Sequence, residues 1–481
     1  MKPGDFVAFD AMGLAQLVHE GKASPLELAE AAIERIETLN PRINAVTEQS
    51  FQLARNCARE LDARLPLAGV PFLAKDMNVA VRGLHLTASC RWLANLPAAT
   101  DDAPLALRWR AAGLSILGRT NLPEWAEDFV TEPTWRGPTA NPWDLNRTPG
   151  GSSGGAAAAV ASGMVPIAHG TDSGGSIRVP AAACGLVGLK PSRGLVPVGP
   201  EHDELVGGLN SDHVLTRTVR DSALMLDMTA GPEATSRQAW TPRTTRYVDC
   251  IETLPAALRI GITMRSPGGV EPETEIANAV DAVVRVLAHA GHRVTQFQFP
   301  APSDIGEAAA VIWMTAIAEE MQHYLAKIGR AATAEELEAI TRECIRRGNA
   351  WSAVDYVDAK RRCSQATRAM YAATRELDIL LTPTTATLPV LTGAIDGRTG
   401  GSDFARWADD AYRYAPYTEL YNVTGQPAVS LPLGHSASGL PIGVHFAARL
   451  GCDDLLLRLA RFLEREMPWR ERSAALLRRY L

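Results

Sequence analysis

Two serines in two glycine-rich loops constrain the fold of this chain more than any other feature. Within residues 149–180, Ser152 lies in GGSSGG and Ser176 lies in GGSIR. Glycine lacks a Cβ atom, so such loops can turn their backbone N–H groups toward a ligand. A nucleophile needs such preorganised donors, because they stabilise the oxyanion that forms when it attacks a carbonyl. The two loops therefore predict a site for nucleophilic catalysis.

The stretch between the loops predicts how the two serines meet. Residues 156–162, AAAAVAS, are strong helix formers, and Gly163 stands where a glycine ends a helix. Residues 165–169, VPIAH, then predict a short buried strand that returns the chain to the second loop. This loop–helix–strand–loop unit can bring Ser152 and Ser176 together.

A serine hydroxyl becomes a strong nucleophile only when a base removes its proton. His169 is the one histidine near the loops, and no evident carboxylate orients it, which argues against a Ser-His-Asp arrangement. Lys75 ends the apolar part of residues 67–79, LAGVPFLAKDMNV. Burial lowers the pKa of a lysine, so that it can act as a base near neutral pH. The alternative is a plain ion pair with Asp76, and the two serine loops favour the base.

Three other interpretations of the glycine-rich run and of the charge are weaker. Residues 151–155 fit the GxSxG pattern of a nucleophile elbow, but the preceding NPWDLNRTPG predicts a loop and not the strand that an elbow requires. A phosphate-binding loop would need a following GK[ST]. The net charge of −6, without a basic block, gives no support for a nucleic-acid partner.

The ordered motifs resemble those of the amidase signature family. The resemblance rests on AKD at Lys75, on GGSSGG, and on GTDSGGSIRVPAAACGLVGLKPS over residues 170–192. It extends over nearly the whole chain, through GRTNLPEW (residues 118–125) and YNVTGQPAVSLPLG (residues 421–434). Within the family, TEPTWRGPTANPWD and the YNVTGQPAVSLPLG segment resemble hydrolases of nylon-oligomer cyclic dimers, with aryl acylamidase-type members close by.

This resemblance implies a mechanism and assigns roles to residues. Ser176 would be the nucleophile, Ser152 the proton shuttle within a cis peptide after Gly151, and Lys75 the neutral base. The implied activity is hydrolysis of amide bonds through an acyl-enzyme, without a metal or an organic cofactor. The implied oxyanion hole consists of the backbone N–H groups of Ser173, Gly174, Gly175 and Ser176. The residues implied to hold the two loops in place are Ser153, Asp172 and Arg178.

Two positions depart from the family pattern. Ala156 stands where members often carry serine, and Arg119 stands where lysine is common. We expect neither residue to touch the proposed chemistry, although Ala156 can alter packing beside the first loop.

The substrate pocket is predicted from the same resemblance and from nearby aromatic residues. The family pattern places Ala126 next to the substrate. Aromatic residues in the adjoining segments suggest an apolar or aryl substrate group, and they are Trp125, Phe129, Trp313, Tyr414 and Tyr417. Cleavage of carbamates (urethanes) or esters by the same machinery is an alternative.

The pattern of elements predicts an α/β fold. Residues 258–263, a helix over about residues 272–290 and residues 292–299 form a strand–helix–strand unit. Such alternation favours a central mixed, largely parallel sheet with helices on both faces. We expect a single amidase domain over residues 1–481. Its signature core would span about residues 60–230, and a helical cap of about residues 303–377 would precede the C-terminal strands.

Two functions of other kinds stay open at this stage. The same motifs occur in one component of a glutamyl-tRNA amidotransferase, which works with a tRNA-binding partner, and a catalytically silent binding protein could share the fold. Seven scattered cysteines without a CxxC spacing suggest reduced thiols, and the first residues lack the apolar run of a signal peptide. We expect a cytoplasmic protein with a small-molecule amide substrate, neither nucleic-acid nor membrane partners, and no sequence signal of its oligomeric state.

Overall fold

A computed structural model describes residues 1–481 except 234–235, 237–239, 241–242, 254–255, 301–304 and 399–402. The described strands form one 11-stranded sheet, in the order β1-β3-β2-β4-β6-β5-β10-β11-β9-β7-β8. The strands are β1 (Val46–Gln49), β2 (Pro71–Lys75), β3 (Ser115–Thr120), β4 (Ile167–Asp172), β5 (Val187–Lys190), β6 (Ser211–Thr216), β7 (Arg259–Ile262), β8 (Arg293–Gln296), β9 (Ile379–Pro383), β10 (Ala428–His435) and β11 (Pro441–Ala448).

The sheet is mixed, as predicted, but the expectation that it is largely parallel is wrong. Among the ten pairings of the described strands, six are antiparallel and four are parallel. The strand–helix–strand unit that suggested a parallel sheet does form a parallel pair, β7 with β8. The centre of the sheet is not parallel. There β10 and β11 are joined by a short loop, and a hairpin of this kind is necessarily antiparallel.

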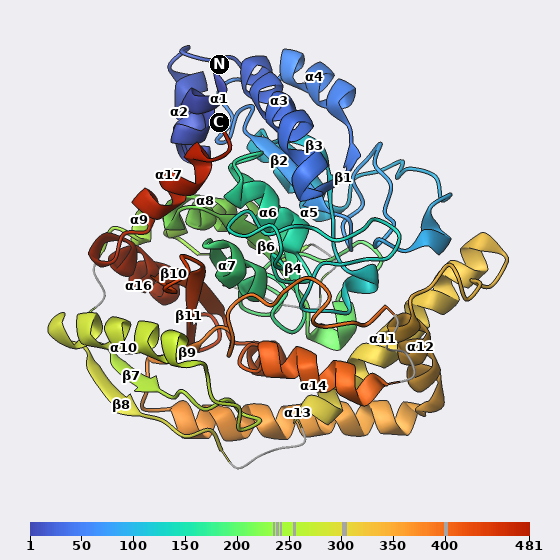
Figure 1. Cartoon of the computed structure of the whole chain (residues 1–481), viewed down its shortest axis with the longest axis vertical. Coiled ribbons are helices and arrows are strands. Elements are labelled where there is room, and N and C mark those ends of the chain that lie inside the picture. Colours follow the sequence, from blue (N-terminus) through green and yellow to red (C-terminus); the bar gives the residue numbers. More distant parts are fainter. Residues whose placement is uncertain (234–235, 237–239, 241–242, 254–255, 301–304, 399–402) are drawn as a thin grey trace.

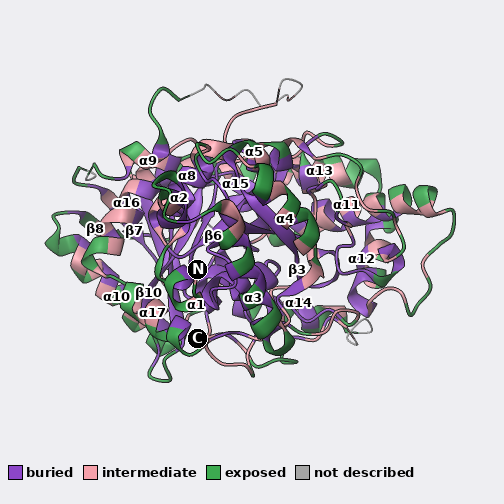
Figure 2. Cartoon of the chain, turned by 90° about the horizontal axis from the view of Figure 1, so that it is seen from above, coloured by how far each residue is buried: buried purple, intermediate pink, exposed green. Residues whose placement is uncertain are grey.

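Helices cover both faces of the sheet, whose strands are largely buried between them (Figure 2). The two termini lie side by side, where α1 and α17 pack together (Figure 1). The helices in chain order are α1 (Pro3–Ala8), α2 (Ala11–His19), α3 (Pro25–Ile43), α4 (Phe51–Glu60), α5 (Pro104–Ala112), α6 (Gly154–Ala161), α7 (Arg178–Cys184), α8 (Val219–Thr229), α9 (Tyr247–Cys250), α10 (Thr274–His289), α11 (Ile305–Ile328), α12 (Ala339–Ala350), α13 (Ala353–Thr374), α14 (Phe404–Tyr414), α15 (Leu420–Thr424), α16 (Asp453–Glu466) and α17 (Arg470–Arg478). Three 3-10 helices are described as well, η1 (Arg91–Leu93), η2 (Glu124–Ala126) and η3 (Leu205–Gly208).

The unit between the two serine loops forms close to its predicted place. Helix α6 begins two residues before the predicted 156–162, and all its residues are buried, so it packs on every side against the protein. Gly163, just beyond its C-cap Ser162, has a positive φ of 73°. Strand β4 begins two residues later than predicted and runs on to Asp172, which brings the chain directly into the second loop.

The region predicted to cap the active site is helical. It consists of α11, α12 and α13, of which α11 packs against both of the others (Figure 1), while residues 303–304 lie outside the described residues. The described strands, from residue 46 to residue 448, belong to the same sheet, and the single domain over residues 1–481 stays a prediction.

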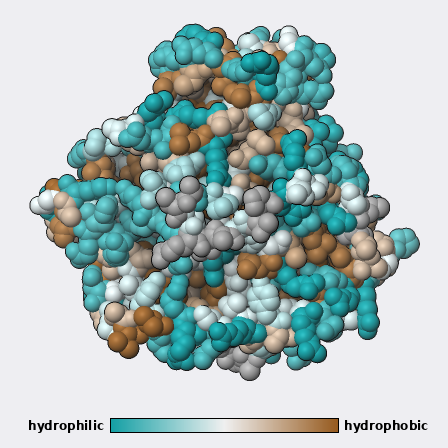
Figure 3. Space-filling view, turned by 180° about the vertical axis from the view of Figure 1, so that it is seen from behind, coloured by the Kyte–Doolittle hydropathy of each residue, from teal (hydrophilic) through white to brown (hydrophobic). Residues whose placement is uncertain are grey.

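The surface shows no broad apolar face on the side drawn in Figure 3, where hydrophobic residues form separate patches among hydrophilic ones. Among the described helices, none combines the length and the apolar character needed to cross a membrane.

Candidate active site

Lys75 is the last residue of strand β2 and lies at the centre of the site. The strand lies between β3 and β4, pairs with both in parallel, and is buried throughout, so its last side chain has no route to solvent. Lys75 Nζ lies 2.7 Å from Ser152 Oγ and 2.7 Å from Thr171 Oγ1. Both partners are neutral hydroxyls. Among the described residues, no carboxylate lies within hydrogen-bonding distance of the amine.

This environment favours the neutral form of the Lys75 amine, which can accept a proton. Burial lowers the pKa of its amine to about 7, and the charges of Asp212 and Asp172 only partly oppose the shift. Desolvation disfavours an ammonium ion, so a buried amine loses its proton more readily than an exposed one. Near neutral pH a large fraction of the Lys75 amines therefore carry a free lone pair. The alternative ion pair with Asp76 does not form, since the Asp76 carboxylate accepts hydrogen bonds from Thr87.

Ser152 lies in the loop before α6 and is completely buried. The peptide bond between Gly151 and Ser152 is cis. A Cβ atom on Gly151 would come within 2.7 Å of the backbone of Phe129 and Val130, so only glycine fits where these two segments cross. The loop is thereby held against a neighbouring chain segment, and the Ser152 hydroxyl is fixed toward Lys75.

Ser176 opens into a cavity, with 8% of its surface exposed. The Ser153 amide N–H donates to the Ser176 carbonyl at 3.1 Å, which ties the two serine loops together. The hydroxyls of Ser152 and Ser176 line the same cavity, which encloses about 470 Å³. In the described part of the chain, the Ser176 hydroxyl makes no hydrogen bond, so it is available to a ligand.

The loop of Ser173, Gly174, Gly175 and Ser176 presents unused backbone donors. Within the described residues, none of these four N–H groups donates a hydrogen bond to the protein. Gly175 has a φ of 140°, and a Cβ atom there would lie 2.2 Å from Thr418 Oγ1, so both its conformation and its surroundings require glycine. Free backbone donors beside a candidate nucleophile are what an oxyanion hole needs.

A buried ion pair between Arg178 and Asp172 holds this loop in place. Arg178 donates to both carboxylate oxygens of Asp172, at 2.9 Å and 2.8 Å, and also to the Thr418 carbonyl and the Asn422 side chain. Although burial raises the pKa of Asp172, the charge and hydrogen bonds of Arg178 hold it well below its usual range. The charged carboxylate accepts from the Ile177 amide at 3.1 Å, which orients the turn after Ser176.

The comparisons with known proteins agree with this geometry. The family model described as Amidase matches residues 27–457. The 6-aminohexanoate-cyclic-dimer hydrolase of Paenarthrobacter ureafaciens is 37% identical over 97% of this chain and 97% of its own length. The chain belongs to the amidase family. The putative amidase AmiC of Mycobacterium leprae is 34% identical over 96% of this amidase and 95% of its own length.

Solved structures of amidases share the same fold. The structure of a 6-aminohexanoate cyclic dimer hydrolase complexed with substrate superposes with a TM-score of 0.90 at 34% identity, covering 98% of this chain and 99% of that one. A bacterial aryl acylamidase of the amidase signature family gives a TM-score of 0.88 at 28% identity, covering 98% of each chain. The family and the amidase signature fold that the motifs predicted are therefore confirmed.

The predicted substrate residues of this amidase fall into two groups. Trp125 and Ala126 of η2 and Trp313 of α11 line the cavity that holds Ser176. The three other aromatic residues, Phe129, Tyr414 and Tyr417, do not line it. Tyr414 and Tyr417 are buried elsewhere, and the Tyr417 hydroxyl donates to the Met264 carbonyl at 2.6 Å. For Tyr414 and Tyr417 the prediction as pocket residues is wrong, because a buried aromatic ring packs into a core as readily as it lines a site. For Phe129 it stays a prediction, since a Cβ atom on Gly174 would lie 3.8 Å from Phe129 Cζ, beside the second loop.

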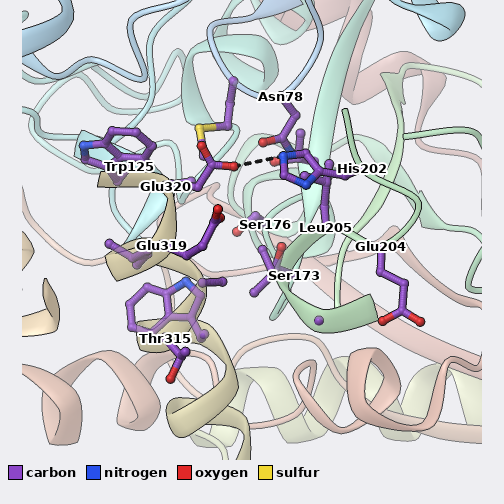
Figure 4. A pocket seen from close by; sticks show the side chains of 18 of the residues that line it. Asn78, Trp125, Ser173, Ser176, His202, Glu204, Leu205, Thr315, Glu319 and Glu320 are labelled. Atoms are coloured by element: carbon purple, nitrogen blue, oxygen red, sulfur yellow. Dashed lines mark ion pairs between the residues drawn. The ribbon is translucent and has the colours of Figure 1, made fainter. Parts of the chain in front are cut away.

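Acidic side chains near the cavity were not predicted. Figure 4 shows Glu319 and Glu320 of α11 facing the loop that carries His202 and Glu204, with Ser176 between the two segments. These residues lie in helix and loop segments with no motif, so the sequence offered no signal for their meeting.

Two further groups around Lys75 were missed or misjudged. Thr171 was missed, although it stands two residues after His169 on β4, a spacing that puts both side chains on the same face of the sheet. His169 does have an orienting carboxylate, since its Nε2 lies 2.9 Å from Asp212 Oδ1, but this imidazole does not line the cavity. Arg119, which was expected not to touch the proposed chemistry, donates from Nη1 to the backbone carbonyl of Lys75 at 3.2 Å and makes no hydrogen bond to its amine.

Proposed function

We propose that this amidase hydrolyses carbon–nitrogen amide bonds of small or oligomeric substrates by a relay of Ser176, Ser152 and Lys75. The observation that carries the proposal is the buried contact of 2.7 Å between Lys75 Nζ and Ser152 Oγ. A lysine whose pKa is about 7 can hold a proton that serine releases and return it later in the cycle. The relatives named for 6-aminohexanoate cyclic dimers make linear and cyclic aliphatic amides the first substrates to test.

Acylation begins when Ser176 Oγ attacks the substrate carbonyl carbon. As the new C–O bond forms, the Ser176 proton passes to Ser152 Oγ, and the Ser152 proton passes to Lys75 Nζ. The carbonyl electrons move onto oxygen, and the N–H groups of the second loop stabilise this oxyanion. The Ser152–Ser176 hydrogen bond of this relay forms when the substrate docks, since catalytic hydrogen bonds commonly tighten only in the substrate complex.

Collapse of the tetrahedral intermediate re-forms the carbonyl and breaks the C–N bond. The leaving nitrogen takes a proton from Ser152, and the Lys75 ammonium returns its proton to Ser152. An amine leaves only after protonation, so this step depends on the same relay. Water then attacks the Ser176 ester while its proton follows the path to Lys75, and Ser176 regains a proton as the carboxylic acid leaves.

Labelling by a fluorophosphonate tests the nucleophile. The reagent should attach to Ser176 in the purified protein, and peptide mass mapping should find it there. Ser176→Ala should lose both the label and amide turnover while unfolding at an unchanged temperature. Labelling at another serine, or undiminished turnover by Ser176→Ala, would overturn the assignment.

A substrate panel tests the reaction class. It should contain aryl amides, linear and cyclic oligoamides, carbamates and esters, assayed without any partner protein. Turnover of amides by the chain alone would support the proposal. Turnover restricted to carbamates or esters, or dependent on a tRNA-binding partner, would replace it with one of the other functions that these motifs allow.

A further inference from the structure

A second cavity lies directly beside the catalytic cavity. It encloses about 510 Å³, comparable with the 470 Å³ of the catalytic cavity. We call the two the catalytic chamber and the outer chamber. Seven residues line both of them, namely Met77, Asn78, Trp125, Glu201, His202, Leu205 and Glu320. The chambers therefore adjoin along a common wall.

An ion pair forms part of this wall. His202 Nε2 lies 3.2 Å from Glu320 Oε1, and the pair joins the loop before η3 to helix α11 (Figure 4). A second ion pair, between Lys327 Nζ of α11 and Glu201 Oε1 at 4.0 Å, links the same two segments, with side chains that are 48% and 64% exposed. Hydrogen bonding to Glu320 raises the pKa of His202, so the imidazole keeps its proton to higher pH than a free histidine. The two side chains are 34% and 26% exposed, and partly exposed pairs of this kind contribute little to stability.

The two chambers differ in chemistry. The catalytic chamber holds the serines and the acidic side chains of Glu319 and Glu204. The outer chamber is lined largely by apolar side chains, among them Ala80, Leu86, Leu93, Leu96 and Ala98, and it also has charged lining residues, Asp101, Asp102, Glu201 and Lys327. An apolar chamber beside a nucleophile suits an aliphatic chain, because each methylene that it removes from water adds to affinity.

We propose that the His202–Glu320 pair is a partition that sets substrate length, and that the outer chamber binds the far end of a long aliphatic chain attached to the scissile amide. Short amides fit in the catalytic chamber alone. A longer chain reaches the apolar outer chamber only by displacing the ion pair, which the low stability of a partly exposed pair permits. This inference rests on the proposed amidase function and adds the class of substrate that the site prefers.

Chain-length series test the partition. One series carries saturated acyl chains of 2 to 12 carbons on p-nitroaniline, and the other carries saturated amines of the same lengths on acetic acid. For Glu320→Ala, kcat/KM with the longest chain relative to the shortest should rise at least about tenfold over wild type in one series. Each buried methylene accounts for roughly fourfold in affinity, so a few methylenes suffice.

A matched control separates the partition from a general loss of charge on α11. Glu307 lies on the same helix and pairs with Arg362, also across to another element, but it lines neither chamber. Glu307→Gln should keep the wild-type ratio of long-chain to short-chain activity. A second control fills the outer chamber: Ala98→Trp should remove the long-chain gain when it is combined with Glu320→Ala.

Each outcome decides between the two proposals. If Glu320→Ala and His202→Ala turn over short amides but leave the length ratio unchanged in both series, the partition is wrong and the amidase function stands. If Ala98→Trp leaves the long-chain gain intact, the outer chamber is not where the chain lies. If the wild-type protein hydrolyses no amide of any length, the proposed function fails, and the partition fails with it. His202→Ala serves as the second variant should Glu320→Ala fail to fold.

Discussion

Lys75 Nζ and Ser152 Oγ lie 2.7 Å apart, although 77 positions separate them in the sequence. Lys75 ends a buried strand, and Ser152 stands just before a buried helix, so both are held by rigid elements. Positions fixed in this way lose little freedom when the reaction begins, which favours catalysis. The contact also explains why a lysine is tolerated inside the protein, since its two hydrogen-bond partners remain satisfied when the amine is neutral.

Removal of the Lys75 amine should abolish the relay. Lys75→Ala should lower kcat for an aryl amide by at least about a hundredfold, the range that a general base contributes. Lys75→Arg should be as inactive, because a guanidinium keeps its proton at any pH the enzyme tolerates. Steady-state kinetics with p-nitroacetanilide check both variants. Near-wild-type amide turnover by Lys75→Ala would contradict the base assignment.

The pH dependence should follow the titration of Lys75. Its pKa is lowered to about 7, and only the neutral amine can take a proton from Ser152. Amide kcat/KM should therefore rise as the pH increases from about 5.5, and level off above about 7.5. In Lys75→Ala, any residual hydrolysis of an activated ester should lack this acid limb. A wild-type profile that instead falls as the pH rises through 7 would exclude a lysine base.

Thr171 should act as a positioning residue for the Lys75 amine. Its Oγ1 lies 2.7 Å from Nζ, and it stands on β4 two residues before the loop of Ser173 to Ser176. Thr171→Val keeps the shape but removes this partner, so the amine can rotate away from Ser152, and kcat should fall about tenfold while KM changes little. Thr171→Ser keeps the hydroxyl and should restore most of the rate. Equal losses in the two variants would mean that packing, and not the hydrogen bond, matters at this position.

The sequence singled out residues that the structure brings together, because they stand in segments with distinctive composition. Glycine runs around Ser152 and Ser176 and the single cation at the end of an apolar strand are local patterns. Local patterns need no knowledge of which strand pairs with which. The predicted helix and strand between the serines accordingly begin within two residues of where the structure has them.

The predictions that were wrong or missing concern contacts between segments that are distant in the sequence. The contact of His169 with Asp212 arises because β4 pairs antiparallel with β6, a register that no local pattern reveals. Similarly, Tyr414 lies on α14, and whether it faces the cavity or the core depends on how that helix packs. The ion pair in the wall between the two chambers joins His202, in a loop, to Glu320 on α11, and no sequence motif indicates that these two residues meet.

The ion pair of Arg178 with Asp172 should be essential for stability. Arg178→Ala leaves a buried carboxylate without its partner, and breaking such a pair typically costs about 3–5 kcal/mol. Arg178→Lys should also be strongly destabilising, because an ammonium has three donors on one nitrogen, whereas the guanidinium donates from three nitrogens to both Asp172 oxygens, Thr418 and Asn422. Urea unfolding measures the loss. Glu376→Gln, which removes one partner of the exposed ion pair with Arg259, serves as the matched comparison. It should shift the midpoint of urea unfolding little.

Gly175 should be irreplaceable in the loop of backbone donors. Its φ of 140° is unfavourable for other residues, and an added Cβ atom would lie 2.2 Å from Thr418 Oγ1. Gly175→Ala should cost about 1–3 kcal/mol of stability, and lower kcat by more than tenfold as the donors shift. A double-mutant cycle with Thr418→Ala separates the two causes of the stability loss, which are the collision with Thr418 and the strain of the positive φ. If the collision dominates, the second substitution should recover part of the stability loss, because the two side chains then no longer overlap. If φ strain dominates, the two losses should simply add, and a Gly175→Ala variant with wild-type kcat would contradict the oxyanion role of this loop.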